Sequence, residues 1–351
     1  MLDFYKNKKV FITGHTGFKG TWLCHILLNA GAKLTGYALE PPTKPSLFSQ
    51  TSLKKLMPSI IADIRNRDNL VQAIQDATPD IVFHLAAQPL VRYSYYEPAL
   101  TYETNVMGTV NILEALRIAP TVKSFLNITT DKVYENKEWH WGYRENENLC
   151  GFDPYSNSKS CSELVTYSYC KSFFRHKDAP AISTARSGNV IGGGDYSDDR
   201  IIPDCIRAAI GGEEVVVRNP SSIRPYQHVL DCLSGYLMLA EKQYFNKNLE
   251  GSYNFGPDEE SCVSTGNLTD LFCETWGSDV SWRIQGDCDN SPYEANFLKL
   301  DCSKAKAVLG WKPKWDIKTA VKKTVEFSKI NTDEERQKSL NMQIKEYFCS
   351  L

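Results

Sequence analysis

The chain has 351 residues, of which 42% are hydrophobic and 23% charged, proportions typical of a globular protein rather than a disordered one. Its 40 basic side chains nearly balance 42 acidic ones, and a net charge of -2 favours neither nucleic acid nor a membrane surface. No apolar run approaches the ~18 residues that a spanning helix needs. The N-terminus runs directly into a strand, without a signal-peptide pattern. We therefore expect a cytoplasmic protein with one large domain and a substantial second lobe.

The cysteines and histidines lack the spacing of a metal site. The closest pair among the 11 cysteines, Cys161 and Cys170, is separated by too many residues for a zinc knuckle. The six histidines include no pair one helical turn apart. We predict free thiols and no metal.

Short apolar runs alternate with helix-length segments over the first 130 residues. Strands are predicted at residues 10–13, 33–39, the end of 53–61, 81–85 and 125–128, and helices at 20–30, 69–77 and 99–118. Strands separated by helices form right-handed βαβ units. The pattern predicts an α/β fold built on a Rossmann-type, doubly wound parallel sheet.

Beyond residue 186 glycines, prolines and an acidic segment at 195–199 interrupt this rhythm. Long loops of this kind usually carry function. The shorter elements expected here are a strand at 215–217, a helix at 229–241, a segment at 253–255 and tail helices from about 303 and 317. We predict a Rossmann domain of residues 1–185 plus 229–252. A smaller, mainly C-terminal α/β lobe of residues 186–228 plus 253–351 would bind the substrate.

A glycine-rich turn follows the first strand and opens the first helix. Its spacing, GxxGxxG, is a variant of the dinucleotide-binding fingerprint. The glycines permit a tight turn, so that a pyrophosphate can sit on the helix N-terminus. A plain glycine turn is the alternative, but the position within a strand-helix-strand series favours a dinucleotide. The candidate residues are Gly14, His15, Thr16, Gly17, Phe18, Lys19 and Gly20.

Two later segments complete the candidate cofactor site. Asp63 and Ile64 follow the third strand, where the Asp63 carboxylate can accept a hydrogen bond from an adenine amino group. Leu85, Ala86 and Ala87 follow the fourth strand and leave room for a flat ring.

The end of the second strand decides between the two dinucleotides. Residues 37–39 are uncharged, and Glu40 comes late for a ribose contact. No arginine stands there to hold a 2′-phosphate, so NAD is favoured over NADP. His84, at the end of the fourth strand, is expected to be structural.

Tyr155 and Lys159 lie four residues apart after Asp153-Pro154, a helix cap followed by a first-turn proline. This spacing places both side chains on one helical face. An ammonium beside a phenol at a helix N-terminus, next to oxidised nicotinamide, is expected to lower the phenol pKa. The phenolate can then remove an alcohol proton while the alcohol carbon gives up a hydride.

The segment 129–135 (TTDKVYE) stands at the end of the fifth strand, where this architecture places its chemistry. Thr130, Asp131 and Lys132 are expected to face the same site as Tyr155. The alternative is an ordinary turn with a capping Asp131 and a solvated Lys132.

Together these motifs resemble the extended short-chain dehydrogenase/reductase family, and within it the nucleotide-sugar 4,6-dehydratases that act on CDP-D-glucose. The resemblance covers nearly the whole chain. It rests on GHTGFKG at 14–20, HLAAQPLV at 84–91, NVMGT at 105–109, TTDKVYEN at 129–136, WGYREN at 141–146, DPYSNSK at 153–159, RSGNVIGGGD at 186–195, IRPYQHV at 223–229 and LKLDCSKA at 298–305. Relatives that act on dTDP-glucose or GDP-mannose carry Glu where this chain has Lys132.

The resemblance implies conversion of CDP-D-glucose to CDP-4-dehydro-6-deoxy-D-glucose with NAD, for bacterial surface polysaccharide, by a homodimer or higher homo-oligomer. Tyr155, with Lys159 and Thr130, would deprotonate the sugar O4. Asp131 would be the acid at O6. Lys132 would be the base at C5, or would only orient the substrate while Glu135 or water is the base.

The resemblance also implies roles around this centre. Asn105 would support the site geometry. The candidate substrate-binding residues are Gln88, Arg92, Asn189, Arg218 and Arg224, with Arg224 at the diphosphate. Trp139, Trp141 and Tyr143 are interpreted as packing residues, with stacking on the nucleotide base as the alternative. Two other functions stay open: a nucleotide-sugar 4-epimerase and a non-catalytic NAD-binding regulator.

Overall fold

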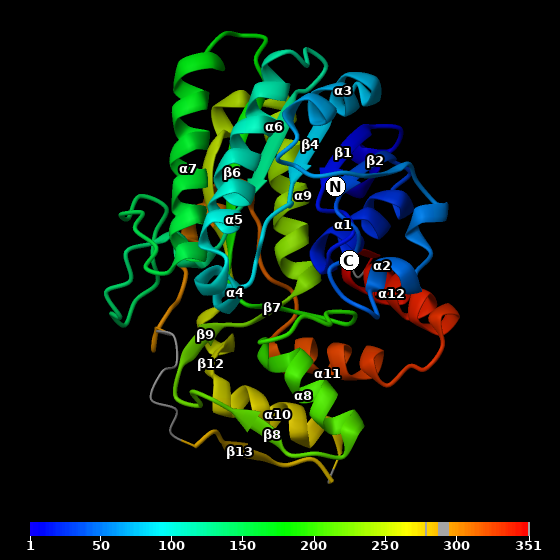
Figure 1. Ribbon diagram of the computed structural model, residues 1–351, viewed down its shortest axis with the longest axis vertical. Coiled ribbons are helices and arrows are strands. Elements are labelled where there is room, and N and C mark those ends of the chain that lie inside the picture. Colours follow the sequence, from blue (N-terminus) through cyan, green and yellow to red (C-terminus); the bar gives the residue numbers. More distant parts are fainter. Residues whose placement is uncertain (278, 287–294, 350–351) are drawn as a thin grey trace.

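The computed structural model describes residues 1–277, 279–286 and 295–349. Its centre is a sheet of seven parallel strands in the order β11-β6-β5-β4-β1-β2-β3. The strands are β1 (Lys9–Thr13), β2 (Lys33–Ala38), β3 (Ser59–Ile61), β4 (Ile81–His84), β5 (Ser124–Ile128), β6 (Ala181–Ser187) and β11 (Gly251–Phe255). The prediction of a Rossmann-type doubly wound sheet is confirmed (Figure 1).

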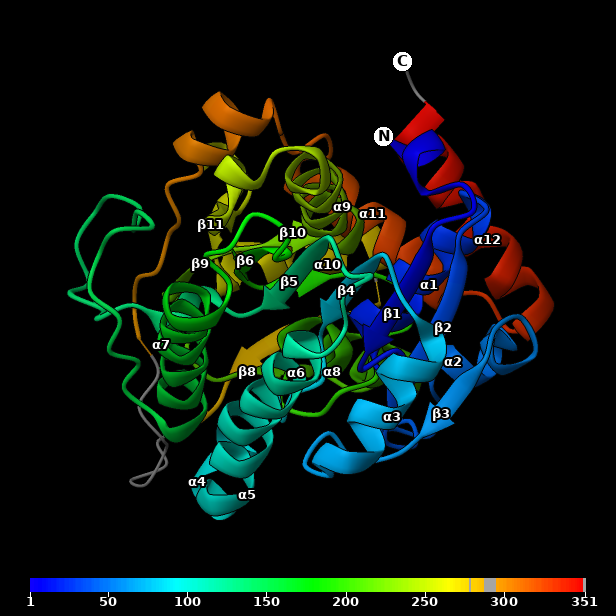
Figure 2. The ribbon, with the colours of Figure 1, turned by 90° about the horizontal axis from the view of Figure 1, so that it is seen from above.

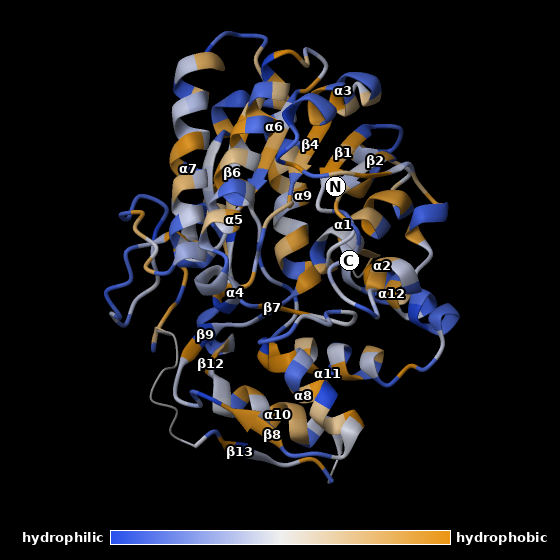
Figure 3. Ribbon diagram, in the orientation of Figure 1, coloured by the Kyte–Doolittle hydropathy of each residue, from blue (hydrophilic) through white to orange (hydrophobic). Residues whose placement is uncertain are grey.

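Helices cover both faces of the sheet (Figure 2). One face carries α3 (Arg67–Ala77), α6 (Gly108–Arg117) and α7 (Pro154–Phe173), and the other α1 (Phe18–Asn29) and α9 (Val229–Phe245). Side chains of β1 alternate between the two cores, with Phe11 on one side and Val10 and Ile12 on the other. Both faces are therefore apolar, as Figure 3 shows for the strands of the sheet.

The segment predicted as one helix at 99–118 is continuous but irregular. It consists of α5 (Pro98–Tyr102), a widened π turn at Glu103–Met107 and α6. Such bulges are common at functional sites because they reorient one turn of side chains. Here the turn carries Asn105.

The second lobe lies beyond the carboxyl ends of the strands (Figure 1). It contains α8 (Ile201–Gly211), α10 (Thr265–Trp276) and α11 (Ile317–Ser328), which share an apolar core with the strand pair β8 (Val215–Val217) and β13 (Trp282–Ile284). Two further pairs are β9 (Ile223–Pro225) with β12 (Cys262–Ser264), and β7 (Val190–Ile191) with β10 (Gln227–His228). The strand predicted at 215–217 is present, whereas α8 and α10 were not predicted.

Short elements connect these parts. They are α2 (Leu47–Gln50), α4 (Val91–Tyr96), the 3-10 turns Leu2–Tyr5, Leu53–Lys55, Asp131–Val133, Lys247–Leu249 and Glu259–Ser261, and a π turn at Ala305–Leu309. None of the described helices is long and apolar enough to cross a membrane.

The structure divides the chain differently from the predicted lobes at two places. β11 extends to Phe255 and pairs with β6, so residues 253–255 belong to the Rossmann sheet. The last helix, α12 (Asp333–Cys349), packs against α1 and α2 as well as α11, and Asn341 accepts a hydrogen bond from Asn29 over 3.0 Å. Both differences arise from long-range packing that local patterns do not report.

Candidate active site

The glycine-rich loop has the shape of an anion cradle. Gly14 has a φ of +75° and lies so close to Leu85 and Ala86 that a Cβ would meet their backbone at 2.8 and 2.7 Å. Gly17 stands at the N-cap of α1 and provides no side chain to cap it. The first N–H groups of α1 are thus left for a ligand, as in sites that hold a pyrophosphate. These residues fit a dinucleotide.

His15 and Thr16 point away from this cradle. The imidazole of His15 is buried against β2, where its Nε2 hydrogen-bonds Ser59 Oγ at 2.7 Å, and burial lowers its pKa to about 4. Thr16 donates to the carbonyl of Leu39. Both side chains therefore shape the loop and leave phosphate contacts to its backbone.

The Lys19 side chain, unlike those of His15 and Thr16, extends to the carboxyl end of β6. Its ammonium donates to Ser187 Oγ over 3.3 Å and lines the pocket between the lobes. Burial lowers its pKa, while Asp131 and Asp195 oppose this shift. Lys19 thus lies between the cofactor cradle and the substrate pocket, next to Phe18, whose ring approaches Gly192.

The segment after β3 differs from the expectation in one respect. The Asp63 carboxylate is held by Arg65 through hydrogen bonds of 2.7 to 3.1 Å, which lower its pKa. Ile64 is buried against Gly108. An adenine amino group would therefore share Asp63 with Arg65, a neighbour that the sequence argument left out.

The segment after β4 is held by main-chain contacts. Leu85 donates its N–H to the carbonyl of Thr13, and Ala86 donates to the Thr13 hydroxyl. His84 is buried and hydrogen-bonds Thr13 Oγ1 at 2.8 Å, in agreement with a structural role. Ala87 follows as a half-buried residue.

Tyr155 and Lys159 lie on α7, whose N-terminus is capped as expected: Asp153 accepts from the N–H of Ser156 over 2.9 Å. Both side chains are buried on one face of the helix. The Lys159 ammonium donates to the carbonyl of Ile128 over 3.1 Å. α7 is thereby joined to the end of β5.

In the protein without a cofactor, burial dominates the electrostatics at Tyr155. Burial raises the pKa of Tyr155 to about 12, and the Thr130 hydroxyl and the Arg200 guanidinium only partly oppose this. The pKa of Lys159 is lowered to about 8, first by burial and then by Lys19. In the protein alone, therefore, desolvation outweighs the expected lowering of the phenol pKa.

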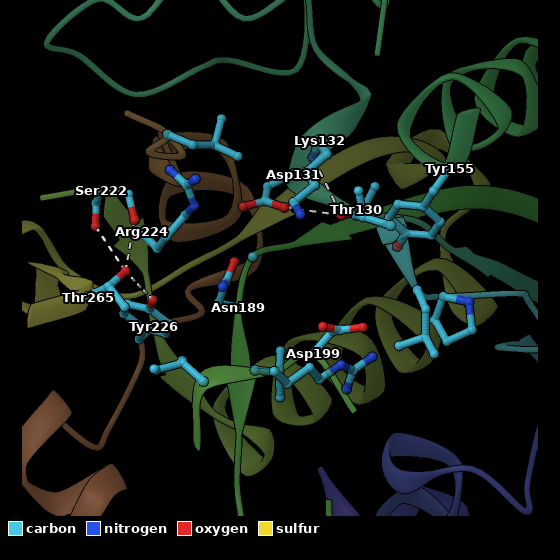
Figure 4. A pocket seen from close by; sticks show the side chains of 18 of the residues that line it. Thr130, Asp131, Lys132, Tyr155, Asn189, Asp199, Ser222, Arg224, Tyr226 and Thr265 are labelled. Carbon is cyan, nitrogen blue, oxygen red and sulfur yellow. Dashed lines mark hydrogen bonds between the residues drawn. The ribbon is translucent and has the colours of Figure 1, made fainter. Parts of the chain in front are cut away.

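Thr130, Asp131 and Lys132 form the turn that follows β5 and line the same pocket as Tyr155 (Figure 4). The Thr130 hydroxyl caps the turn by accepting from the N–H of Lys132. Asp131 is buried, and desolvation raises its pKa against the nearby charges of Lys132, Arg224 and Lys19. Asp131 is therefore not the backbone cap of the alternative interpretation, since Thr130 provides that contact.

Glu135, the alternative base, does not line the pocket. It is exposed, and its carboxylate lies 3.6 Å from Lys137 Nζ and accepts from Asn148. Trp139 stacks on Tyr143 with ring centroids 5.3 Å apart, and Trp141 is exposed, so no aromatic residue of this segment faces the pocket.

Asn105 and Gln88 are joined to each other beside α7. The amide of Asn105 accepts from the N–H of Gln88 over 2.8 Å and donates to Ser158 Oγ over 2.8 Å. The side chain of Gln88 donates to Thr101 and to the carbonyl of Leu90, so it supports the loop and does not line the pocket. Asn105 is thus hydrogen-bonded to Ser158 of α7, and its support of the active-site geometry stays a prediction.

The far side of the pocket belongs to the second lobe. Figure 4 shows Arg224 across from Tyr155, with Asn189 between them. The guanidinium of Arg224 is buried and donates to the carbonyls of Ile223 and Ala295. The pocket's polar side chains therefore run from the Tyr155 phenol at one end, past Asp131, to Arg224 at the other.

Two further arginines meet on one carboxylate. Arg92 and Arg218 lie 3.3 and 2.8 Å from Oδ1 of Asp199, and all three residues line the pocket. Asp199 itself has a φ of +58°, in the left-handed region that Asp adopts more readily than most other non-glycine residues. The two arginines come from different parts of the chain and meet at one side of the pocket.

Sequence reasoning missed several polar residues of the pocket, among them Arg200, Asp195 and Ser187. Arg200 pairs with Asp195 at 2.9 Å and lies close enough to lower the Tyr155 pKa, and Ser187 accepts from Lys19. The acidic segment 195–199 was the available signal, because it stands in a long loop before α8. Among the described residues no group of three His, Cys, Asp or Glu side chains is arranged to hold a metal ion.

With this geometry established, comparison with known proteins places the chain in a family. The family model described as GDP-mannose 4,6 dehydratase matches residues 11–324. The chain belongs to this family of nucleotide-sugar dehydratases. It is 49% identical to the CDP-glucose 4,6-dehydratase of Salmonella typhimurium over 94% of its own length and 93% of that protein. It is 26% identical to the dTDP-glucose 4,6-dehydratase of Streptomyces antibioticus, with 92% of each chain covered.

Solved structures of similar proteins share the fold. The dTDP-glucose 4,6-dehydratase from Bacillus anthracis, in complex with NAD, superposes with a TM-score of 0.76 at 21% identity, over 94% of this chain and 99% of that one. The UDP-glucuronic acid 4-epimerase from Bacillus cereus, in complex with UDP-glucuronic acid and NAD, gives 0.77 at 23% identity, over 91% and 98%. Dehydratases and epimerases thus share this architecture, and the site residues must separate them.

Proposed function

We propose that this chain is an NAD-dependent hydro-lyase that converts CDP-D-glucose to CDP-4-dehydro-6-deoxy-D-glucose and water. The observation that carries the proposal is a buried carboxyl, Asp131, beside Lys132 and across from Tyr155 in one pocket. The extensive similarity to a CDP-glucose 4,6-dehydratase supports the choice of substrate.

The cofactor would lie along the carboxyl ends of β1, β3 and β4. The residues proposed to hold it are the loop Gly14–Gly20, Asp63, Ile64, Leu85, Ala86, Ala87, Tyr155 and Lys159. When bound, NAD takes a hydride from C4 of the sugar and returns it to C6, and its positively charged ring favours a phenolate.

Tyr155 is proposed to remove the proton from the sugar O4 hydroxyl. Its phenol is stabilised as the anion by Thr130 and Arg200, and Lys159 holds a positive charge on the same helix face. Because burial alone keeps the phenol neutral, the additional positive charge of the loaded site is needed for this step.

Elimination would follow from the Asp131-Lys132 pair. A C4 ketone acidifies the C5 proton, and Lys132 is proposed to accept this proton after its ammonium has lost one. Asp131, whose pKa burial raises, then donates a proton to the O6 hydroxyl, and the C6–O6 bond breaks to release water. Hydride return to C6 and protonation at C5 leave the sugar with no net redox change.

The diphosphate and nucleoside are proposed to bind at the second lobe. Arg224, Arg92 and Arg218 provide guanidinium groups for bidentate phosphate contact, and Asn189 provides an amide between them and the sugar. Gln88 would act indirectly, since its side chain supports the loop beside Asn105.

A 4-epimerase would use the same Tyr155, Lys159 and NAD but would need no acid at O6. The buried Asp131, with its raised pKa, favours dehydration over C4 inversion. A non-catalytic NAD-binding regulator would need neither the acid Asp131 nor the Tyr155-Lys159 pair. These differences make the acid the discriminating residue.

The test is a panel of nucleotide sugars with NAD: CDP-, dTDP-, UDP- and GDP-glucose, each analysed by mass spectrometry and for a 4-keto group. We expect CDP-glucose to lose one water and become a 4-keto-6-deoxy sugar fastest. Tyr155→Phe keeps the ring and should lower turnover by roughly 10²–10⁴ while NAD still binds. C4 inversion without water loss would contradict the proposal.

We further propose that the protein acts as a homo-oligomer in the cytoplasm and supplies precursors of bacterial surface polysaccharide. Exposed apolar side chains on the outer sides of neighbouring helices, Met107, Leu164 and Tyr167, support self-association. Sedimentation analysis checks it: Leu164→Glu with Tyr167→Glu should shift an oligomer towards the monomer.

A further inference from the structure

A buried ion pair lies beneath the candidate active site. Glu163 is on α7, four residues after Lys159 and eight after Tyr155, and therefore on the same helix face. Its two oxygens accept from Arg186 of β6 at 2.8 and 2.9 Å, and each side chain is only 2% exposed. The pair is bidentate, which fixes the relative orientation of helix and strand.

Glu163 also holds the end of β5. Its carboxylate accepts from Thr129 Oγ1 over 2.5 Å and from Thr184 Oγ1 over 2.6 Å. Thr129 lies between Ile128, whose carbonyl accepts from Lys159, and Thr130, which faces the pocket. One carboxylate thus connects the helix of the phenol to the strand end of the acid.

Arg186 extends the connection to the segment after that strand end. It donates to the Tyr134 hydroxyl over 2.7 Å and to the carbonyl of Glu145 over 3.1 Å. Tyr134 donates in turn to Asn254 of β11. The residues that flank Asp131 and Lys132 on both sides are therefore tied to the same ion pair.

Stability alone does not account for such a pair. Removing two charges from water is costly, and a buried ion pair can often be replaced by apolar side chains without loss of stability. What the pair does provide is one fixed register between α7 and the end of β5. Catalytic groups need such fixing, because a displacement of about 1 Å can cost about 10²-fold in rate.

We propose that Glu163 and Arg186 are a positioning pair that fixes Tyr155 and Lys159 against the turn at Thr130. This inference rests on the proposed function. Neither residue lines the pocket, so the pair acts through its neighbours.

The charges around Lys159 predict how the pH dependence of activity should change when Glu163 is replaced. Lys19 from α1 and His84 from β4 face the ammonium, and Glu163 is the anion near it. Burial and Lys19 lower the Lys159 pKa to about 8, and Glu163 opposes them. Glu163→Gln would leave Arg186 as an unpaired cation, so the Lys159 pKa should fall further and activity should be lost at a lower pH.

The test uses the full chain and the nucleotide sugar that the wild type turns over fastest. For Glu163→Gln we expect kcat to fall by about 10²-fold with a small change in KM, and the alkaline side of the pH profile to move to lower pH. The affinity for NAD, measured without a sugar, should also begin to weaken at a lower pH than in the wild type, because Lys159 is proposed to contact the cofactor. The matched control is Glu250→Gln, since Glu250 contacts Cys170 of α7 and Ile182 of β6 far from the site.

A substitution at Thr129 distinguishes the positioning role of Glu163 from the effect of its charge. It also provides a test if Glu163→Gln does not fold. Thr129→Val removes the hydrogen bond to Glu163 but keeps its charge, so kcat should fall while the pH profile stays. Thr129→Ser should restore kcat. Lowered thermal stability with unchanged kcat and pH profile in both Glu163→Gln and Thr129→Val would overturn the inference. Failure of wild-type enzyme on CDP-glucose would instead refute the proposed substrate and leave the pair to be tested on the sugar that reacts.

Discussion

The Thr130 hydroxyl donates to Oδ1 of Asp131 over 3.0 Å, whereas Oδ2 of Asp131 is buried and has no hydrogen-bond partner among the described residues. A carboxylate in this setting is poorly solvated, and burial raises the Asp131 pKa although Lys132 opposes the shift. The carboxyl is thus suited to hold a proton that it can give to a leaving hydroxyl.

Asp131→Asn tests this role without changing the size of the side chain. We expect water loss to slow by roughly 10²–10⁴, because the amide cannot transfer a proton to O6. Exchange of the C5 proton in deuterated water should continue, since it precedes the loss of water. Formation of the 6-deoxy product at the wild-type rate would remove Asp131 from the mechanism.

Lys132→Ala tests the base at C5. The variant should lose deuterium incorporation at C5, measured by mass spectrometry of recovered sugar in deuterated water, because no other described base candidate of the segment lines the pocket. Lys137→Ala is the control: Lys137 is exposed and pairs with Glu135. If Lys132→Ala exchanges C5 as fast as wild type, the lysine only orients the substrate.

Arg224→Ala tests the diphosphate contact. Loss of a charge-assisted contact should raise KM by about 10- to 100-fold with a smaller change in kcat. Binding of CDP alone, measured by calorimetry, should weaken in parallel. Arg67→Ala, at an exposed arginine outside the pocket, should leave both quantities unchanged. Wild-type affinity for CDP in Arg224→Ala would place this arginine outside the substrate site.

The buried histidines predict loss of stability in acid. Burial lowers the pKa of His15 and His25 to about 4 and of His84 and His228 to about 3. Below their ordinary pKa of about 6.5 the unfolded chain binds protons that the folded chain does not, so stability falls as pH falls. Asp231, with its pKa raised to about 6, contributes in the opposite direction. We expect the free energy of unfolding in urea to fall by at least about 2 kcal/mol between about pH 7 and about pH 5.

Single substitutions test whether the buried histidines cause this loss of stability in acid. His84→Gln should flatten the dependence of stability on pH, whereas His176→Gln, at an exposed residue, should not change it. A stability that is constant from neutral pH to about pH 5 would mean that these imidazoles are not buried in the neutral form.

The features that could be predicted are those with a local signature. The glycine loop, the capped helix at Asp153-Pro154 and the turn at residues 129–132 follow from spacing within a few residues, and the structure brings them to one edge of the sheet. Parallel strands separated by helices predicted that edge, because their carboxyl ends must lie together.

The features that were missed depend on contacts between distant residues. Glu163 and Arg186 pair across 23 positions, and β11 joins the sheet beside β6 only after the second lobe has begun. Burial is likewise a property of the fold, so the raised pKa of Tyr155 and the direction of Lys19 had no signal in local spacing. The choice of cytosine over other bases stays a prediction from similarity.

The most direct test of the proposed function follows the hydrogen of C4. CDP-glucose that carries deuterium at C4 is incubated with the protein and NAD, and the product is analysed by NMR and mass spectrometry. We predict a 4-keto-6-deoxy sugar that carries this deuterium at C6, because the hydride that leaves C4 returns to C6 within the same pocket. A C4-inverted sugar with the deuterium still at C4 would contradict the account and identify an epimerase.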